Sequence, residues 1–529
     1  MINLTTNPFF LDKEAIAWVK STLASMTTAQ KAGQVFCPMG FTDDSHVLSH
    51  RLVDIGVGGM MYRPDSAAKT QQTHRTIQHM APIPLLLAAN TECGGNGLAF
   101  EGTSFGQPMA VSAAQNPEYA YRMGYTACAE GAAMGLNWSF APIVDINMDF
   151  HNPITNVRTF GSDPEQVLCC ASAYLRGAKE NHVAVAIKHF PGDGVDERDQ
   201  HIVTSVNSLD AEQWDKTYGY VYQNLIDQGA QTVMAGHIAL PCYASKEERF
   251  LPASLAKSLL TGLLREKLGF NGLISTDATP MVGFTAAMPR SKAIPTAIAA
   301  GADMILFNKD LDEDYRFLLD GIDSGIVTLE RLDEAVTRIL ATKAALGLHR
   351  KKELVPGVEA LNVVGCERHR RWARETADKA ITLVKDTQNL LPLSPDKTPR
   401  IYLNVIQKDT DPDNPVVRAW KALFEREGFH VTVRDRRVTV TVQDMGDLAA
   451  MSPEKKALMH EMYRSVEEAR KSTDLYVYIC NMENASNNTT LRLNWNVTFG
   501  LGDDAPWFVS EIPALMISTA YPYHLFDAP

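Results

Sequence analysis

The chain has 529 residues, more than one ordinary hydrophobic core holds, so its length predicts two domains. Its composition is that of a globular protein, and a formal net charge of −12 argues against nucleic acid or an anionic membrane as a partner. The first residues lack the cationic start and apolar core of a secretory signal, and no apolar run approaches the roughly 18 residues of a membrane span.

Eight cysteines are scattered through the expected strands and helices, with no C-x-x-C pair and no histidine at zinc spacing. Reduced thiols in the cytoplasm are the simplest explanation of this pattern. We therefore expect a cytoplasmic protein without a zinc site.

In chain order, residues 10–33 form an expected helix with a polar break at Thr27 and Thr28, and short apolar runs recur after it. The eight runs are 33–38, 57–62, 84–89, 138–144, 183–187, 232–239, 272–275 and 302–307. Stretches long enough for a helix separate most of them. Short buried strands that alternate with helices pair in parallel, and eight such units in about 310 residues predict a (β/α)₈ barrel.

Helix-start signals agree with this spacing. Asp163, Pro164 and Glu165 supply a capping side chain, a proline for the first turn and an acid near the amino end. Asp210 and Thr328 open further helices in a similar way. These signals support the barrel independently of the apolar runs.

The basic, irregular stretch 348–375 is expected to be a linker between a catalytic barrel at 1–347 and a second domain at 376–529. A helix at 372–383 leads into strand candidates at 401–406, 431–433, 475–480 and 514–518, which predict an α/β sandwich with an αβα layer order. The sequence ends soon after the last of these strands, so an incomplete second domain is part of the expectation.

Polar and ionisable residues stand at one end of nearly every expected barrel strand. They are Asn90, Glu92, Asp145, Asn147, Lys188, His189, His237, Asp277 and Asn308. In a barrel of this kind the active site lies at the carboxyl ends of the strands. We therefore predict that these residues converge on a catalytic site.

The stretch 186–201 carries the densest chemistry of the chain. Asp199 and His201 flank Gln200, a spacing at which the carboxylate can accept the imidazole N–H, orient the ring and raise its pKa above about 6.5. A histidine that is protonated near neutral pH can act as a general acid. The alternative is a solvated acidic loop that caps the next helix.

Asp277 ends another apolar run and is expected two strands round the barrel from Lys188 and His189. A carboxylate that faces a proton donor is the arrangement for cleaving a glycosidic bond. Lys188 and His189 can hold hydroxyl groups and keep Asp277 ionised by their charge. The alternative role for Asp277 is a helix cap.

The motif K-H-F-P-G-x-G at 188–194, followed by D-x-H at 199–201, resembles the signature of the β-N-acetylglucosaminidase branch of family-3 glycoside hydrolases. The resemblance extends to segments at 141–147, 152–164, 233–241, 275–281 and 380–393. It implies a retaining exo-glycosidase that removes terminal β-linked N-acetylglucosamine, often from peptidoglycan fragments, with no metal or organic cofactor.

On the matching positions, the resemblance implies that Asp277 is the nucleophile of a covalent glycosyl-enzyme intermediate. It further implies that His201, tuned by Asp199, is the general acid and base. The residues that would bind the sugar or line its pocket are Lys188, His189, Arg158, His237 and Asp145.

Three positions depart from the family pattern. Asp193 stands where the family has His or a similar residue, and Gln200 stands in the middle of the dyad, where the family has Ser or Thr. In the loop 89–97, Asn90 replaces an Asp that helps to hold the sugar, and Glu92 is either its substitute or a structural cap. The surplus acids of the dyad loop match no calcium-loop pattern and are expected in solvent or facing the substrate: Asp193, Asp196 and Glu197.

Several alternatives remain at this stage. A neutral histidine in place of a carboxylate removes repulsion against incoming phosphate, so a β-N-acetylglucosaminide phosphorylase is physically reasonable on this fold, as is a β-glucosidase. A non-catalytic sugar-binding barrel is a third possibility. A zinc hydrolase lacks a ligand set, because His189 and His237 alone do not form one. The expected partner is a small carbohydrate, and the oligomeric state stays open.

Overall fold

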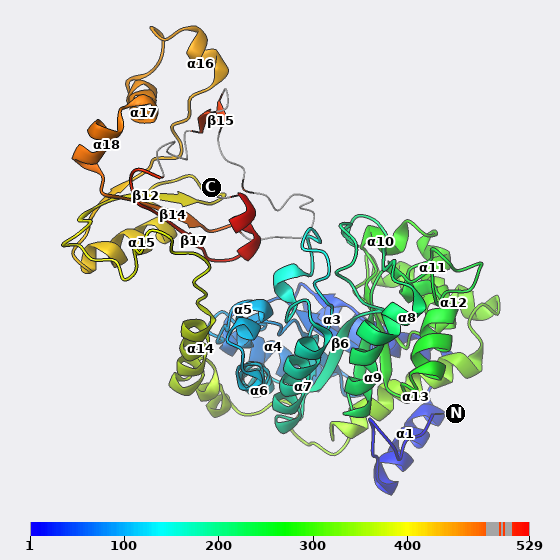
Figure 1. The fold of residues 1–529 in the computed structure, drawn as a ribbon. Helices are drawn as coiled ribbons and strands as arrows, with labels where there is room; N and C mark the ends of the chain where they lie inside the picture. Colours follow the sequence, from blue (N-terminus) through cyan, green and yellow to red (C-terminus); the bar gives the residue numbers. More distant parts are fainter. Residues whose placement is uncertain (1, 483–492, 494–496, 499–500, 503–509, 528–529) are drawn as a thin grey trace. The chain divides into compact units, whose positions relative to one another are not determined.

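The computed structural model describes residues 2–482, 493, 497–498, 501–502 and 510–527. The chain divides into two compact units, Met1–Ile381 and Thr382–Pro529, which Figure 1 draws as ribbons. The segment 348–375, expected to be a linker, lies inside the first unit and contains most of helix α14 (Glu367–Ala380). In α14 the fully buried His369 pairs with Glu130 at 2.8 Å, a contact that ties this basic helix to the first unit.

Nine parallel strands of the described residues form the sheet of the first unit, in the order β1-β11-β10-β8-β6-β5-β4-β3-β2. Their bounds are Phe36–Cys37 (β1), Met39–Gly40 (β2), Gly59–Tyr62 (β3), Leu86–Ala89 (β4), Trp138–Ser139 (β5), Ala184–Phe190 (β6), Thr232–Ala235 (β8), Leu273–Ala278 (β10) and Met304–Leu306 (β11). Only Pro38 separates β1, which pairs with β11, from β2, which pairs with β3. The sheet therefore closes on itself as a (β/α)₈ barrel, and each of the eight predicted apolar runs overlaps one of its strands.

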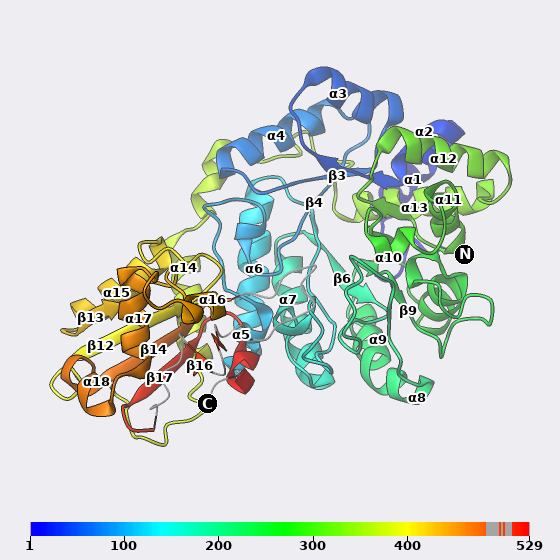
Figure 2. The ribbon, with the colours of Figure 1, turned by 90° about the horizontal axis from the view of Figure 1, so that it is seen from above.

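Helices follow the strands in turn, and α6, α7 and α9 run along the outside of the strands in Figure 2. Their bounds are Lys13–Ser25 (α1), Thr28–Gln34 (α2), Ser45–Ser49 (α3), Ala67–Met80 (α4), Pro108–Ala113 (α5), Pro117–Ala133 (α6), Pro164–Glu180 (α7), Ala211–Trp214 (α8), Tyr220–Asp227 (α9), Val282–Thr285 (α10), Arg290–Ala300 (α11), Leu311–Asp323 (α12) and Leu329–Ala345 (α13). A π-helical segment, Ser258–Lys267, covers the barrel between β8 and β10. Within the described chain, no helix is both long enough and apolar enough to cross a membrane.

The predicted helix starts are confirmed. Asp163 accepts the N–H of Glu165 (3.3 Å) at the start of α7, and Thr328 accepts that of Arg331 (3.2 Å) at the start of α13. At the predicted polar break, Thr27 forms a capping box with the third residue of α2. These side chains satisfy N–H groups that the first turn of a helix leaves without partners.

Strand β6 is buried along its whole length, as its continuous apolar sequence requires when helices cover one side and the barrel interior the other. The carboxyl end of the strand departs from this apolar pattern, because Lys188 and His189 are ionisable and yet only 2% and 4% exposed. Buried charges are stable only when they are paired. Lys188 and His189 therefore need charged or hydrogen-bonding partners near the carboxyl end of β6.

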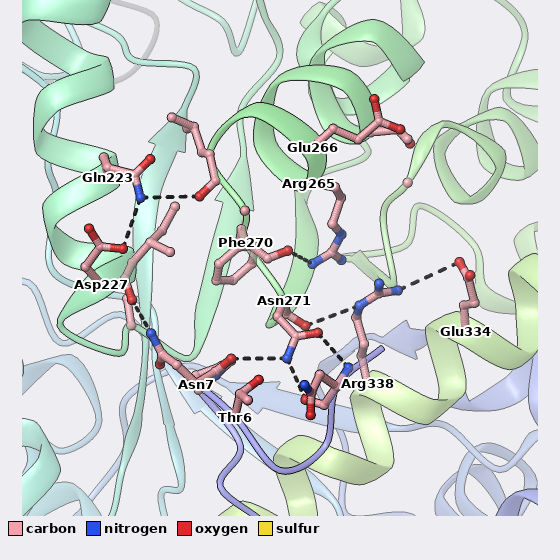
Figure 3. A pocket seen from close by; sticks show the side chains of 18 of the residues that line it. Thr6, Asn7, Gln223, Asp227, Arg265, Glu266, Phe270, Asn271, Glu334 and Arg338 are labelled. Atoms are coloured by element: carbon pink, nitrogen blue, oxygen red, sulfur yellow. Dashed lines mark hydrogen bonds and ion pairs between the residues drawn. The ribbon is translucent and has the colours of Figure 1, made fainter. Parts of the chain in front are cut away.

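A cavity of about 760 Å³ lies at the opposite, amino ends of β8 and β10, where the first residues of the chain cross the barrel (Figure 3). The Asn271 side chain donates to the carbonyl oxygens of Asn3 (2.7 Å) and Asn7 (3.1 Å). Nearby, the buried Asp303 carboxylate binds three arginines, which are Arg265, Arg331 and Arg338. Groups at this end of such a barrel hold the fold together rather than perform chemistry.

The second unit contains a four-stranded parallel sheet in the order β13-β12-β14-β17. The bounds of its elements are Arg400–Ile406 (β12), Pro415–Arg426 (α15), His430–Val433 (β13), Val442–Gly446 (α16), Pro453–Tyr463 (α17), Val466–Ser472 (α18), Leu475–Cys480 (β14), Val497–Thr498 (β15), Leu501–Gly502 (β16) and Ala514–Ser518 (β17). One face of the sheet packs on Val417 and Phe424 of α15, and the other on Ala469 of α18. The predicted second α/β domain is confirmed, with strands in all four predicted places.

The fully buried Lys343 of α13 generates a prediction about stability. Its ammonium group donates to Gln34 (2.7 Å), and burial lowers its pKa to about 7. In the unfolded chain the pKa is about 10.4, so between pH 7 and 10 the unfolded state binds more protons and the free energy of unfolding rises with pH. Lys343→Met removes this dependence, which amounts to roughly 2 kcal/mol between pH 7 and pH 9. Urea unfolding at both pH values measures it.

The loss of the Gln34 contact in this variant is the same at every pH, so the pH-dependent difference isolates the lysine. Lys20→Met, at an exposed position of α1, is the matched control and should leave the pH dependence unchanged. Parallel pH profiles of wild type and Lys343→Met would contradict the prediction.

Candidate active site

The predicted site residues meet at the carboxyl ends of neighbouring strands. Glu92 follows β4, Asp145 follows β5, His237 follows β8, and Asp277 lies near the end of β10. Since the sheet order is β10-β8-β6-β5-β4 and all strands are parallel, these ends form one edge of the barrel. The remaining residues come from β6 and the connections after β5 and β6: Arg158, Lys188, His189, Asp199 and His201.

Asp145 is the hub of the site. Its completely buried carboxylate accepts the backbone N–H of His189 (3.1 Å), the His189 ring N–H at Nδ1 (2.7 Å) and the backbone N–H of Asp193 (2.8 Å). Three N–H donors account for the burial of this carboxylate and fix the tautomer of His189. Asp145 therefore positions His189, whereas the sequence predicted that it lines the sugar pocket itself.

Asp277 faces His189, with 4.0 Å between the carboxylate Oδ2 and the ring Nε2. Burial favours the neutral acid, but the charge of His189 and a hydrogen bond from the Ala278 N–H (2.7 Å) outweigh it and hold the pKa of Asp277 below its ordinary value. Its side chain keeps a 16% exposed fraction. Asp277 is thus an ionised carboxylate that remains accessible, as a nucleophile must be.

Glu92 joins two cations at the ends of β5 and β6. It forms a two-pronged pair with Arg158 (2.8 and 2.9 Å) and accepts from Lys188 (2.6 Å), which also lies 3.4 Å from Asn90. Burial opposes ionisation of Glu92, but the charges of Arg158 and Lys188 hold its pKa well below the ordinary range. Glu92 is therefore an ionised carboxylate beside Asn90, paired with two cations.

Asp199 and His201 contact each other in the loop after β6. Asp199 is completely buried and accepts both the His201 ring N–H at Nδ1 (2.7 Å) and its backbone N–H (2.8 Å). Burial opposes the charge of His201, but the hydrogen bond and charge of Asp199, and then the charge of Asp277, outweigh it and raise the pKa of His201. About a third of the His201 side chain is exposed. Because Nδ1 bonds Asp199, Nε2 is the ring nitrogen on the side away from that carboxylate.

His237 has a supporting position. Its Nδ1 atom hydrogen-bonds with the Ser254 hydroxyl (2.8 Å), and its Nε2 atom with the carbonyl oxygen of Ala278 (2.9 Å), next to Asp277. The side chain is completely buried, and burial lowers its pKa. The sequence placed His237 in the sugar pocket; in the structure both ring nitrogens have protein partners, one of them on the strand that carries Asp277.

Asp193 and Gln200 have positions that the sequence did not reveal. The Asp193 side chain accepts from Asn152 (2.9 Å), Gly194 (2.8 Å) and Gln200 (3.3 Å) and is 2% exposed, so it is buried and not solvated. Burial, followed by the charge of Asp145, raises the pKa of Asp193 to about 8. In the sequence, the one indication that these two residues have special positions is that both depart from the family pattern.

A second group of ionisable side chains lies on the neighbouring loops. Ligand atoms of Asp149, His151 and Glu197 come within 4.8 Å of one another, close enough to hold a cation. The His151 ring already pairs with Asp149 at 2.9 Å, and half of its side chain is exposed. Exposed acids gather in this way without an ion, and none of the three joins the contacts around Asp277.

The strand ends of a (β/α)₈ barrel here bring an ionised carboxylate together with a carboxylate-bound histidine and two paired cations, an arrangement that fits a glycoside hydrolase. Comparison with known proteins agrees with this class: the family described as "Glycosyl hydrolase family 3 N terminal domain" matches residues 27–342. The chain therefore belongs to glycosyl hydrolase family 3.

Two relatives resemble the whole chain. A protein of Cellulomonas fimi named beta-N-acetylglucosaminidase/beta-glucosidase is 40% identical over 535 residues, which cover 100% of this chain and 92% of the relative. A solved structure of the beta-glucoside phosphorylase BglX is 42% identical with a TM-score of 0.89, covering 99% of this chain and 91% of that one. A family-3 beta-N-acetylglucosaminidase from Paenibacillus sp. shares the fold at 23% identity, with a TM-score of 0.76 and coverage of 96% and 92%.

The Asp199–His201 pair predicts a measurable pKa. We expect the NMR signal of His201, identified as the one that His201→Ala removes, to titrate above pH 6.5, and Asp199→Asn to lower that midpoint by about one unit, because the neutral amide no longer favours imidazolium. His151→Ala, at an exposed histidine, is the control for assignment. An unchanged midpoint in Asp199→Asn would contradict the role of Asp199.

Proposed function

We propose that this protein is a retaining exo-glycosidase that hydrolyses terminal β-linked N-acetylglucosamine, with Asp277 as nucleophile and His201 as acid and base. One observation carries the proposal: the pKa of Asp277 is lowered and that of His201 is raised, so each holds near neutral pH the charge that the first step needs. The printed name of the Cellulomonas fimi relative supports the sugar.

In the first step, the Asp277 carboxylate attacks the anomeric carbon while the bond to the leaving oxygen breaks. His201 gives its Nε2 proton to that oxygen, and Asp199 holds the ring in the required tautomer through Nδ1. The product is a glycosyl ester of Asp277. Lys188 and Arg158, which Glu92 holds in place, and His189, which Asp145 holds, are assigned to the sugar hydroxyls.

In the second step, neutral His201 takes a proton from water, which attacks the anomeric carbon and releases Asp277. Two displacements at one carbon retain its configuration. No metal or organic cofactor is part of this proposal, because Asp277 and His201 supply both the nucleophile and the proton.

Phosphate is a second candidate acceptor of the glycosyl group, and the charges around the site favour it. Deprotonated His201 is neutral, and Arg158 and Lys188 stand close by, so an incoming phosphate meets no anionic base. Phosphate would attack the glycosyl ester directly and release a sugar 1-phosphate. The printed name of the structure that is 42% identical to this chain supports this candidate and a β-glucoside as its substrate.

We further propose peptidoglycan fragments as the source of the sugar and the cytoplasm as the place of reaction. Support comes from the sequence: the resemblance to the N-acetylglucosaminidase branch and the eight scattered cysteines.

A rate comparison tests sugar and acceptor together. We expect turnover of 4-nitrophenyl β-N-acetylglucosaminide to exceed that of the β-glucoside by about tenfold or more. A site that hydrogen-bonds the N-acetyl group of its substrate loses those bonds when the substrate is a glucoside. Added phosphate should leave the rate and the free-sugar product unchanged. Formation of sugar 1-phosphate would establish the second acceptor instead, and preference for the glucoside would overturn the sugar.

Two substitutions test the assigned roles. Asp277→Ala should abolish turnover, because no other group can form the ester. His201→Ala should lower kcat/KM by about 10²- to 10⁴-fold on a phenyl glycoside and far less on a 2,4-dinitrophenyl glycoside, whose leaving group needs no proton. His151→Ala serves as the matched control. Equal losses on both substrates would count against His201 as the acid.

A further inference from the structure

Two positions that depart from the family pattern contact each other. The Gln200 side chain donates from Nε2 to Oδ2 of Asp193 (3.3 Å), and its Oε1 atom accepts the backbone N–H of His237 (2.8 Å). Gln200 is 1% exposed, whereas a third of the His201 side chain is exposed, so the two neighbours leave the loop in different directions. One amide thus joins the loop after β6 to the end of β8.

We infer that Gln200 and Asp193 form a positioning pair that fixes the loop carrying Asp199 and His201. The inference rests on the role of His201 proposed above. Neither residue touches the reacting atoms in this assignment; both act by determining where the His201 ring lies.

The backbone of the same loop is tied to the strand that carries the nucleophile. The carbonyl oxygen of Gln200 accepts the N–H of Gly283 (3.2 Å), and that of His201 accepts the N–H of Val282 (2.9 Å). Both donors stand in the connection that follows Asp277 on β10. Main-chain hydrogen bonds thus join the loop that carries His201 to the start of α10, which follows Asp277 closely in the chain.

Two glycines make room for this arrangement. A Cβ atom at Gly283 would lie 2.5 Å from the carbonyl oxygen of Gln200, and one at Gly236 would lie 3.2 Å from its Oε1 atom and 3.1 Å from Cβ of His189. Close backbone approach of this kind requires glycine. The sequence around β8 and β10 is thus fitted to a Gln200 that occupies this position.

Asp193 anchors the pair to the hub of the site. Its backbone N–H donates to Asp145 (2.8 Å), the carboxylate that also holds His189. Its side chain receives Asn152 and Gly194 on Oδ1, which leaves Oδ2 facing Gln200. A displacement of about 1 Å at a catalytic group can cost on the order of 10²-fold in rate. The pair therefore matters most for the step in which His201 transfers a proton.

Gln200→Asn tests this inference. The shorter side chain keeps the amide but cannot reach both partners. We expect kcat/KM to fall by about 10- to 100-fold on a phenyl β-N-acetylglucosaminide and by less than about threefold on the 2,4-dinitrophenyl substrate. The alkaline limb of kcat/KM should also move toward pH 6.5, because a looser Asp199–His201 contact favours imidazolium less. Arg198→Gln, an exposed change on the same loop, is the matched control.

Asp193→Asn provides an independent variant if Gln200→Asn fails to fold. In the amide an NH₂ group, which cannot accept a hydrogen bond, replaces one of the two oxygens that receive Gln200, Asn152 and Gly194. At least one of these contacts must break, and the same leaving-group dependence is expected. In the double variant the loss should equal that of the more impaired single variant, as for residues that act as a unit.

The inference is overturned if the variants lose equal activity on the two substrates, if the alkaline limb does not move, or if the losses add in the double variant. In each of these cases turnover by wild type would leave the proposed function intact. Failure of wild type to turn over either glycoside would instead overturn the proposed function, and the inference with it.

Discussion

One buried carboxylate determines the geometry of the site. Asp145 accepts three N–H groups from residues 189–193, two from His189 and one from Asp193. An acid with no exposed surface is stable only with such donors, so the chain at the end of β6 has to follow a path that supplies them. That path aims His189 at Asp277 and begins the loop that ends in Asp199 and His201.

The charges around this hub differ in how they are compensated. Glu92 is shared between Arg158 and Lys188, which leaves an excess of positive charge at that end of the site. Asp199 lies on the other side of the site, where it accepts the ring N–H of His201 and favours the protonated form of that ring. Burial opposes the charge of Glu92, and its two cationic partners outweigh that effect and keep its pKa low.

The features of the fold and of the site that could be predicted are those that depend on local sequence pattern, such as apolar runs and the residues that end them. Strands such as β6 and β14 are continuous apolar runs, and the ionisable residues at the end of β6 follow from where barrels place their sites. His237 looks the same in sequence whether its ring faces a sugar or Ser254, because burial and partners are tertiary properties. The place of α14 in the first unit left no clear signal for the same reason: its sequence is basic, and its contacts with α6, such as His369 with Glu130 and Arg122 with Glu375, appear only in the folded chain.

The identity of the acid and base also shapes what can follow the first displacement. In the proposed mechanism, esterified Asp277 carries no charge, and a deprotonated His201 is neutral, whereas a deprotonated carboxylic acid in its place would be an anion. The nearby cations Arg158 and Lys188 then keep their pairing with Glu92, and Asp199 bonds the Nδ1 side of the His201 ring. An anionic acceptor meets attraction at this stage, and water meets a neutral base. The choice between them therefore depends on how closely a phosphate can approach the ester, which the position of the His201 ring, and hence of Gln200, governs.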